Sequence, residues 1–490
     1  MYVRELQWVE PVTAMRRLGH RSHLTFLDSA ARHELLGRYS YLTCDPFSTY
    51  RVANGQASWN GLTLEADPWK VLRTLLAKYP QEHRPDLPPF QGGAAGYLAY
   101  DMNRTLERLS APPIAGLGLP QSILHFYDVV ISFDHRDNKC WIVSTGWPEQ
   151  DRVRRSERAL RRADEFAALL AGPKAPQKGC PSKAGAWRSN FSRDGYIAAV
   201  QRVIDLILAG DVFETNIAQR FSTRLSTSFD PLAFYCQLRS LNPAPFAALL
   251  RWGKLTIASS SPERFLKLEG RQVETRPIKG TIARSPDPNE DHRRAAALLA
   301  SEKDQAENTM IVDLLRNDLS RVCTAHSVGV PALCNLESYA SVHHLVSIVT
   351  GKLAGDEDAV SLLRACFPGG SITGAPKPRS MEIITEIERI AREVYCGAIG
   401  FIGFNGHMDT SIAIRTVTID GDLAVFHAGS GITALSKPEA EYEETLTKAE
   451  RIFDAFGSEP AGAFLSSSTI TIPSCSILPA ISTSSVKQRK

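Results

Sequence analysis

The sequence predicts a fold of the α+β class, in which strands and helices both build the core. Residues 1–150 alternate short strand-like runs with turn signals, and the apolar run 122–133 is typical of one strand buried in a sheet. From Trp187 to residue 456, long helical patterns and strands are joined by glycine-rich segments. The remaining parts are a helix and linker at 151–186 and a Ser/Thr/Pro-rich tail at 457–490, which we expect to be disordered.

The composition is that of a globular chain with a large core. Of 490 residues, 43% are hydrophobic and 22% are charged, and the net charge of +3 gives no reason to expect nucleic acid or an anionic membrane as a partner. No apolar run approaches membrane-spanning length, and the N-terminus has no apolar targeting segment. The nine cysteines are scattered without a C-x-x-C pair, so we expect a cytoplasmic protein.

The segment 275–281 places a lysine at a restricted point of the chain. Pro277 fixes its own φ and Gly280 frees the backbone, just past an expected strand at 271–274. We expect Lys279 to lie on a rigid bend. These residues alone are equally compatible with an ordinary exposed turn lysine.

Two pairs of acids occur at helical spacing. A helix is predicted from Asp287, its N-cap, to about Leu319, and Asp304 and Glu307 share one face of it. Glu441 and Glu444 repeat the spacing on a helix that continues to residue 453. Brought together, the pairs would form an oxygen-only site suited to Mg²⁺, and the alternative is two solvated helix faces.

Three further features are compatible with an anionic ligand. Arg415 lies in the apolar middle of an expected strand at 410–417, where a buried guanidinium requires either an internal acid or a ligand. Residues 428–432 are expected to form a glycine-flanked nest of backbone amides, and 369–377 open a helix predicted at 379–391. His344 is expected to be buried, with a core histidine as the alternative to a catalytic one. This inventory suits a magnesium-dependent enzyme acting on a small polycarboxylate.

Several long motifs resemble those of the chorismate-utilising enzymes, which include anthranilate, aminodeoxychorismate, isochorismate and salicylate synthases. The resemblance extends over about 190–455 and rests on 260–265, 277–281, 306–308, 310–319, 341–347, 374–377 and 441–445. It implies one intertwined α+β domain of two packed, mainly antiparallel sheets with surrounding helices, to which the N-terminal third contributes strands.

Two positions distinguish the branches of this family. Isochorismate and salicylate synthases carry lysine where Glu214 stands here, and anthranilate synthases carry alanine where Lys279 stands. The lysine at 279 implies the branch that makes 4-amino-4-deoxychorismate on the route to p-aminobenzoate and folate. An anthranilate synthase is the first alternative, and a non-catalytic subunit that binds chorismate or tryptophan is the second. Glu214 itself departs from the glutamine that is common in both amino-transferring branches.

The resemblance also implies roles for individual residues. Lys279 would be a nucleophile, Glu263 its general acid/base and His344 a residue that orients the substrate, and an attacking Lys279 must be neutral, which requires burial or a nearby cation. Mg²⁺ would be held by Glu307 and Glu444, with Asp304 and Glu441 close by or through water. The residues implied in substrate binding are Thr281, Thr373, Tyr395, Arg415, Gly429, Ser430 and Gly431.

The chain carries no glutamine amidotransferase nucleophile and no evident lyase domain. The resemblance therefore implies ammonia from a separate glutaminase subunit, in a heterodimer. It also implies a candidate tryptophan pocket, whose walls would include Ser29, Asn242, Pro243 and Phe246.

Overall fold

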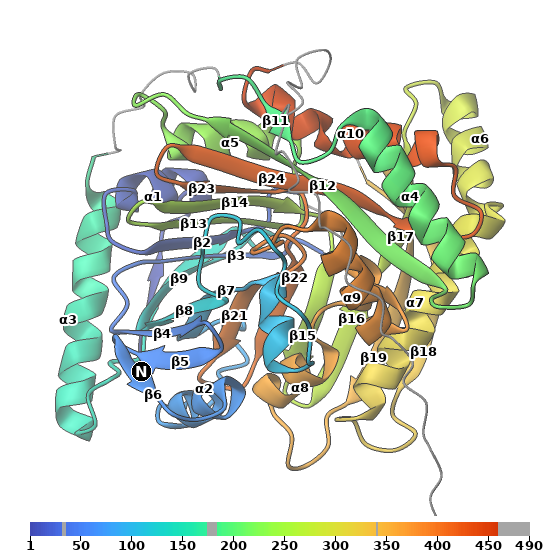
Figure 1. Ribbon diagram of the computed structural model, residues 1–490. Helices are drawn as coiled ribbons and strands as arrows, with labels where there is room; N and C mark the ends of the chain where they lie inside the picture. Colours follow the sequence, from blue (N-terminus) through green and yellow to red (C-terminus); the bar gives the residue numbers. More distant parts are fainter. Residues whose placement is uncertain (32–35, 174–183, 340–341, 459–490) are drawn as a thin grey trace, which may run out of the picture.

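Two antiparallel sheets of 12 strands each form the centre of the molecule (Figure 1). The computed structural model describes residues 1–31, 36–173, 184–339 and 342–458. The fold class predicted from the sequence, α+β with two packed and mainly antiparallel sheets, is confirmed. Of the predicted linker and tail, residues 174–183 and 459–490 lie outside the described residues.

The first sheet takes strands from both halves of the chain. In spatial order its strands are β1 (Tyr2–Leu6), β10 (Lys139–Ser144), β9 (Val129–Asp134), β3 (Tyr39–Thr43), β2 (Leu24–Asp28), β13 (Phe246–Trp252), β14 (Leu255–Ser261), β23 (Thr416–Asp420), β24 (Leu423–Ile432), β12 (Glu214–Arg224) and β11 (Arg188–Ser189), and β20 (Gly374–Ala375) also pairs with β12.

The second sheet also takes strands from both halves of the chain. Its order is β17 (Ile278–Ala283), β19 (Val342–Lys352), β16 (Gln272–Arg276), β15 (Arg264–Glu269), β22 (Met408–Ile412), β21 (Ala398–Gly403), β7 (Gly93–Leu98), β8 (Ser122–Tyr127), β4 (Ser48–Ala53), β5 (Gln56–Trp59) and β6 (Leu62–Leu64), and β18 (Gly329–Ser338) pairs with β19. The two halves meet where β2 pairs with β13 and where β7 pairs with β21.

The helices lie around the outside of the sheets (Figure 1). They are α1 (Pro11–Leu18), α2 (Pro68–Ala77), α3 (Arg152–Ala171), α4 (Arg193–Leu208), α5 (Pro231–Leu241), α6 (Pro288–Leu299), α7 (Glu302–Ser320), α8 (Ala359–Cys366), α9 (Lys377–Glu388) and α10 (Pro438–Ala455), with 3₁₀ turns η1 (Tyr100–Thr105) and η2 (Gly370–Ile372). No helix in the described part of the chain is long and apolar enough to cross a membrane.

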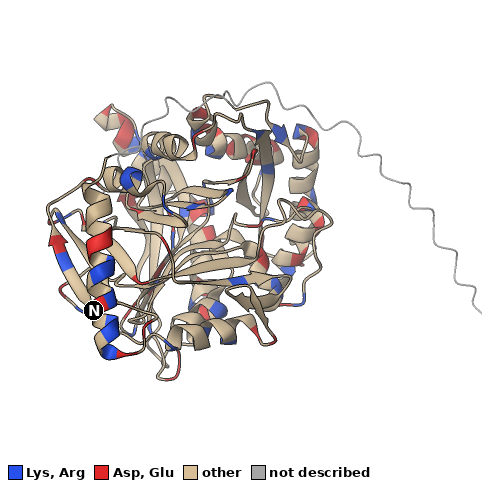
Figure 2. Cartoon of the chain, turned by 90° about the vertical axis from the view of Figure 1, so that its left-hand side faces the viewer, with Lys and Arg blue, Asp and Glu red and all other residues tan. Residues whose placement is uncertain are grey.

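The run 122–133 forms two strands rather than the single one expected. β8 belongs to the second sheet and β9 to the first, and the chain crosses between them at Asp128. Asp128 is buried and accepts hydrogen bonds from Arg158 at 2.9 Å and Arg162 at 3.3 Å, both on α3. An apolar run gives no sign of this crossing, because both strands are buried on both faces. Along α3, basic and acidic residues are interleaved (Figure 2).

The predicted helix 287–319 is also divided. α6 ends at Leu299, and Ser301 begins α7 by accepting a hydrogen bond from the Asp304 amide at 3.3 Å. The serine N-cap explains the break, because its side chain satisfies an amide that a new helix would leave free. The new helix start at Ser301 sets the direction in which α7 presents Asp304 and Glu307.

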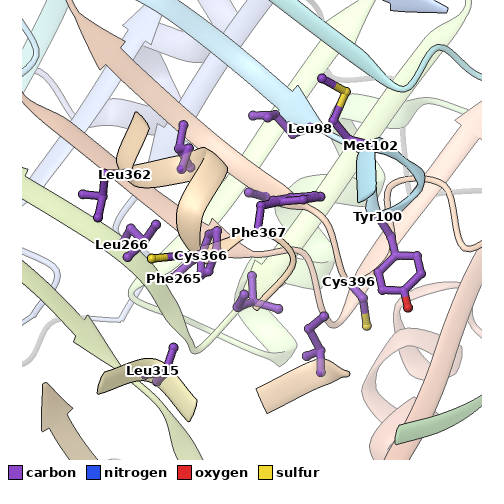
Figure 3. Packing of buried hydrophobic residues seen from close by; sticks show 14 of the residues in the cluster. Leu98, Tyr100, Met102, Phe265, Leu266, Leu315, Leu362, Cys366, Phe367 and Cys396 are labelled. Atoms are coloured by element: carbon purple, nitrogen blue, oxygen red, sulfur yellow. The ribbon is translucent and has the colours of Figure 1, made fainter. Parts of the chain in front are cut away.

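A buried apolar cluster ties α7 and α8 to the second sheet (Figure 3). Phe265 and Leu266 of β15 pack with Leu315 of α7 and with Leu362 and Phe367 at α8. Phe265 comes two residues after Glu263, so this packing fixes the start of β15 beside the candidate active site. The same cluster holds the helix that carries one of the acid pairs.

Gly96 in β7 marks a point where strands approach too closely for any side chain. It lies between Gly400 of β21 and Leu124 of β8, and a Cβ here would meet the carbonyl oxygen of Ile123 at 2.1 Å. The glycine-rich strand β7 thus packs closely against both of its neighbours.

Replacing Gly96 by alanine should therefore lower the free energy of unfolding by about 1–3 kcal/mol, since the strands must move apart. Urea denaturation of the variant measures the loss. Gly355→Ala is a matched control, because nothing lies within 4 Å of its Cβ position. Equal stability of the two variants would contradict this account of the strand contact.

Candidate active site

Lys279 lies in the interior, on an irregular edge of β17. Its side chain is 9% exposed, which excludes an ordinary surface lysine. The pairing with β19 shifts here: Lys279 is opposite Leu345, Thr281 is opposite His344, and Gly280 between them has no opposite residue. The rigid bend expected past the strand at 271–274 is therefore a bulge in the next strand, β17.

Gly280 is required at this bulge for two reasons. Its φ of +75° lies in the left-handed region, and a Cβ would come within 2.9 Å of the Asp304 side chain. The bulge thus lets α7 approach β17, so that one acid of the first pair packs beside the strand that carries Lys279.

The amine of Lys279 is surrounded by carboxylates. Nζ donates a hydrogen bond to Glu214 Oε1 at 2.5 Å, and Glu307 Oε2 lies 3.8 Å away. Burial acts to lower the pKa of Lys279, but the charges of Glu214 and Glu307 outweigh it and raise the pKa above the usual value. In the described part of the chain the neighbours of this amine are acids, which hold its proton, whereas attack as a nucleophile requires the neutral form.

The two acid pairs lie close together, with Lys303 between them. The Lys303 ammonium lies 3.8 Å from Glu307 Oε1 and 3.1 Å from Glu441 Oε1. Burial raises the pKa of Glu307 to about 7, and its Oε1 is buried without a hydrogen-bond partner among the described residues. Among the described residues, no group of three or more acidic, histidine or cysteine side chains is already arranged to hold a metal ion.

The second pair is held differently. Glu441 accepts hydrogen bonds from Ser430 at 2.5 Å and Ser436 at 2.7 Å, whereas Glu444 is partly exposed and paired with Lys448 at 2.7 Å. Burial disfavours the charge of Glu444, but Lys448 outweighs burial and lowers its pKa.

The donors at this point fit a hard divalent cation such as Mg²⁺. All are carboxylate oxygens, and among the described residues Glu307 Oε1 lacks a hydrogen-bond partner. The Lys303 ammonium shows that a positive charge is accommodated among them. A metal ion bound here would take the place of the Lys303 ammonium.

Glu263 is a third acid whose charge acts on Lys279. Its carboxyl group is buried and accepts a hydrogen bond from Ser371 Oγ at 2.6 Å. Burial raises its pKa to about 7, although Ser371 and the charge of Lys279 act in the opposite direction. A carboxyl group with this pKa exchanges protons near neutral pH, as a general acid/base must.

His344 and Arg415 form a second group beside Thr281. His344 is buried, as expected, and its Nδ1 lies 2.7 Å from the Thr281 hydroxyl. Burial lowers the pKa of His344 to about 3, and the charge of Arg415 adds to this, so the imidazole is neutral. A neutral ring can both donate and accept a hydrogen bond.

Arg415 is not in a strand. The expected strand 410–417 is interrupted, and Arg415 lies between β22 and β23 with a φ of +49°. No carboxylate among the described residues forms an ion pair with it, and burial lowers its pKa. Of the two sources of an anion considered from the sequence, the arrangement favours a ligand.

The expected amide nest at 428–432 is instead the end of strand β24. Gly431, Ser430 and Gly429 lie opposite residues 216–218 of β12, and a Cβ at Gly429 would meet the carbonyl oxygen of Ile217 at 2.3 Å. The glycines therefore allow close strand pairing and do not form a turn. Pairing with β23 ends at Phe426, so beyond that residue one edge of β24 faces no other described strand.

Thr373 and Tyr395 support the surrounding loops. The Thr373 hydroxyl donates to the Gly369 carbonyl at 2.9 Å, which fastens the loop that carries Ser371. The Tyr395 ring stacks on His427 with centroids 4.9 Å apart. Tyr395 is buried, and its orientation is fixed by this stack.

A cavity of about 360 Å³ lies between the two sheets, away from Lys279. Ser29 and Phe246, two of the four residues proposed for a tryptophan pocket, line it, whereas Asn242 and Pro243 do not. Its wall combines apolar side chains with six charged residues, which are Asp28, Arg38, Arg264, Lys267, Glu269 and Asp409.

Three residues of the site received no role from the sequence. Glu214 is the nearest partner of Lys279, Lys303 lies among the acids, and Ser371 contacts Glu263. Lys303 directly precedes the first acid pair, which is a local signal. Glu214 and Ser371 come from distant segments, and no spacing rule connects them to Lys279 or Glu263.

The chain matches the model of the chorismate binding enzymes over residues 25–454. It is 39% identical over 442 residues to aminodeoxychorismate synthase component 1 of Escherichia coli K12, covering 89% of this chain and 94% of that protein. It is 38% identical over 457 residues to anthranilate synthase component 1 of Thermus thermophilus, covering 92% and 96%. The crystal structure of anthranilate synthase component I from Streptococcus pneumoniae superposes with a TM-score of 0.76 at 32% identity, covering 84% of this chain and 91% of that one. With its two interleaved sheets, its acid pairs and this extent of similarity, the chain belongs to the chorismate-binding enzymes.

Proposed function

We propose that the chain is an aminodeoxychorismate synthase component I, which converts chorismate and ammonia into 4-amino-4-deoxychorismate in the cytoplasm. The observation that carries the proposal is the buried Lys279, whose amine lies among Glu214, Glu307 and Glu263. Overall identity does not separate the two amino-transferring branches, since it is 39% to one relative and 38% to the other. A lysine at this position distinguishes them, because anthranilate synthases have alanine there.

In the proposed reaction, Lys279 acts as a nucleophile after its ammonium gives a proton to water, a loss that a divalent cation at Glu307 would favour by offsetting the carboxylate charge that holds this proton. Its amine forms a bond to C2 of the ring while the C4 hydroxyl departs, and Glu263 gives this hydroxyl the proton with which it leaves as water. Ammonia then bonds to C4, the C2–nitrogen bond to Lys279 breaks, and the double bonds return to their places. Two displacements retain the configuration at C4, which is a benefit of forming the intermediate on the enzyme.

The remaining side chains would bind and orient chorismate. Arg415, with the open edge of β24 at Gly429, Ser430 and Gly431, would take the enolpyruvyl carboxylate, because its guanidinium has no protein carboxylate as a partner among the described residues. Neutral His344 would hold the C4 hydroxyl. Thr281, Thr373 and Tyr395 would line the pocket and keep water out.

Mg²⁺ would be held by Glu307 and Glu444, with Asp304 and Glu441 close by or through water. Bound there, it would supply positive charge to the ring carboxylate and withdraw electrons from the ring. The support is the oxygen-only donor set and the unpartnered oxygen of Glu307.

A separate glutaminase subunit would supply ammonia. The relatives are named as component 1 of their enzymes, which implies a second component. In the absence of that subunit, ammonium salt would serve as the nitrogen source.

Replacing Lys279 by alanine should abolish the covalent adduct and reduce formation of p-aminobenzoate by at least about 10³-fold, the loss expected for a covalent nucleophile. The assay incubates the chain with chorismate, Mg²⁺ and ammonium salt, adds an aminodeoxychorismate lyase, and follows the adduct by intact-protein mass spectrometry. Lys437→Ala, at an exposed lysine, is the matched control. Direct formation of fluorescent anthranilate without p-aminobenzoate would contradict the assignment. Binding of chorismate without turnover would instead favour a non-catalytic subunit.

The pH dependence of kcat/KM should follow Glu263. This carboxyl group must be protonated to release the hydroxyl, and its pKa of about 7 is above the ordinary value, so the proton is present below pH 7 and lost above it. Above that pH, kcat/KM should fall by about tenfold per unit. In Glu263→Gln the residual activity should lose this decline. A decline that persists unchanged in the variant would assign it to another group.

We also propose that the cavity between the sheets binds tryptophan, since it is about 360 Å³ in volume and combines apolar walls with Asp28 and Arg264. At 100 times its Kd, L-tryptophan should stabilise the protein by about 2.7 kcal/mol. Thermal unfolding with and without the amino acid measures this, and Ser29→Phe, which fills the cavity, should remove the effect. An unchanged unfolding temperature at millimolar tryptophan would exclude this ligand.

A further inference from the structure

Among the described residues, two carboxylates form ion-pair contacts with the Lys279 amine, those of Glu214 and Glu307. Only Glu214 also accepts a hydrogen bond, which fixes the direction of the amine. Nζ donates to Glu214 Oε1 at 2.5 Å, whereas Glu307 Oε2 lies 3.8 Å away. Hydrogen bonds from nitrogen to oxygen extend to about 3.2 Å, so the contact with Glu307 is electrostatic only. Because the lysine side chain is long and flexible, the amine would otherwise be free to turn towards Glu307.

Glu214 is itself firmly held. It is the first residue of β12, it pairs with Ala375 of β20, and its carbonyl accepts a hydrogen bond from Ser380 Oγ at 3.0 Å. On the neighbouring strand, a Cβ at Gly431 would lie 2.3 Å from Glu214 Oε1 and 3.0 Å from Lys279 Nζ. The backbone of β24 therefore packs directly against the ion pair, and any larger residue at 431 would displace it.

An ion pair between Lys279 and Glu214 would contribute little to the stability of the fold. Removing two charges from water is costly, and well-packed apolar side chains often stabilise a core as well or better. In addition, Glu214 Oε2 is buried and has no hydrogen-bond partner in the part of the chain that the structure describes, which adds to the cost. A costly pair at the centre of a site is explained if it serves binding or chemistry.

We propose that Glu214 is a positioning residue, which holds the Lys279 amine ready to attack chorismate and away from the carboxylate of Glu307. The proposal rests on the proposed function, because it takes Lys279 as the nucleophile. Without Glu214, the ammonium group would move onto Glu307. The amine would then be misplaced for attack, and it would also compete with Mg²⁺ for that carboxylate.

The test follows the adduct between Lys279 and chorismate by rapid quenching and intact-protein mass spectrometry, with Mg²⁺ present and ammonia absent. Glu214→Ala should form the adduct at least about tenfold more slowly, the loss expected for a hydrogen bond to a charged group. Glu214→Asp keeps the charge but draws it back by one methylene, so it should be slow as well. Glu214→Gln keeps the length and an acceptor oxygen, and should restore most of the rate.

Two further measurements separate positioning from a loss of folding. At saturating Mg²⁺, chorismate binding should be unchanged in all three variants, and thermal unfolding should show that they are folded. Isothermal titration with Mg²⁺ alone should give weaker binding in Glu214→Ala and Glu214→Asp than in Glu214→Gln. Glu439→Ala, at an exposed glutamate of α10, is the matched control and should behave as wild type.

The outcomes distinguish this proposal from the function on which it rests. Wild-type adduct rates in Glu214→Asp or Glu214→Ala would overturn the positioning role and leave Lys279 as the nucleophile. If the wild-type chain forms no adduct at all, the nucleophilic role of Lys279 is overturned, and the positioning role of Glu214 is overturned with it.

Discussion

The Lys279 ammonium is buried among carboxylates, and much of the local structure follows from accommodating that charge. A buried cation is tolerated only when it is paired, so β12 must bring Glu214 and α7 must bring Glu307 to the same point. The bulge at Gly280 allows α7 to approach, and the missing side chain at Gly431 leaves room for the pair. The elements β12, α7, β17 and β24 thus all meet around the ammonium group of Lys279.

The same principle explains how the acid pairs are arranged without a metal ion. Lys303 lies between Glu307 and Glu441, and Lys448 pairs with Glu444, so each of these three glutamates has a basic side chain nearby. A divalent cation would replace ammonium groups that are already present. The affinity for the proposed Mg²⁺ would therefore depend on how readily these lysines, of which Lys303 is partly exposed, give up their contacts.

Local rules predicted much of the fold and part of the site. The helix start at Asp287, with its capping side chain, is confirmed, and so is the α+β class with two sheets. The burial of His344 followed from its place among apolar neighbours. Each of these depends on residues close together in the sequence.

The sequence-based predictions of secondary structure are wrong where a contact between distant segments determines the local structure. The run 122–133 is divided because Asp128 pairs with arginines of α3, and Arg415 leaves its strand with a left-handed backbone. Residues 428–432 form a strand because β12 lies beside them. Glu214 is separated from Lys279 by a long stretch of sequence, and no spacing pattern could indicate that their side chains meet.

The interleaving of the two halves has a consequence for how the chain is made. β7 obtains its second neighbour only when residues 398–403 have been synthesised, and β2 must wait for residues 246–252. Until then, central strands of both sheets present unpaired edges, which are the parts of a chain most prone to pair with other chains. Pairings so distant in sequence also fold slowly. The N-terminal third is therefore a dependent part of this protein, and during translation it requires protection until the last strands arrive.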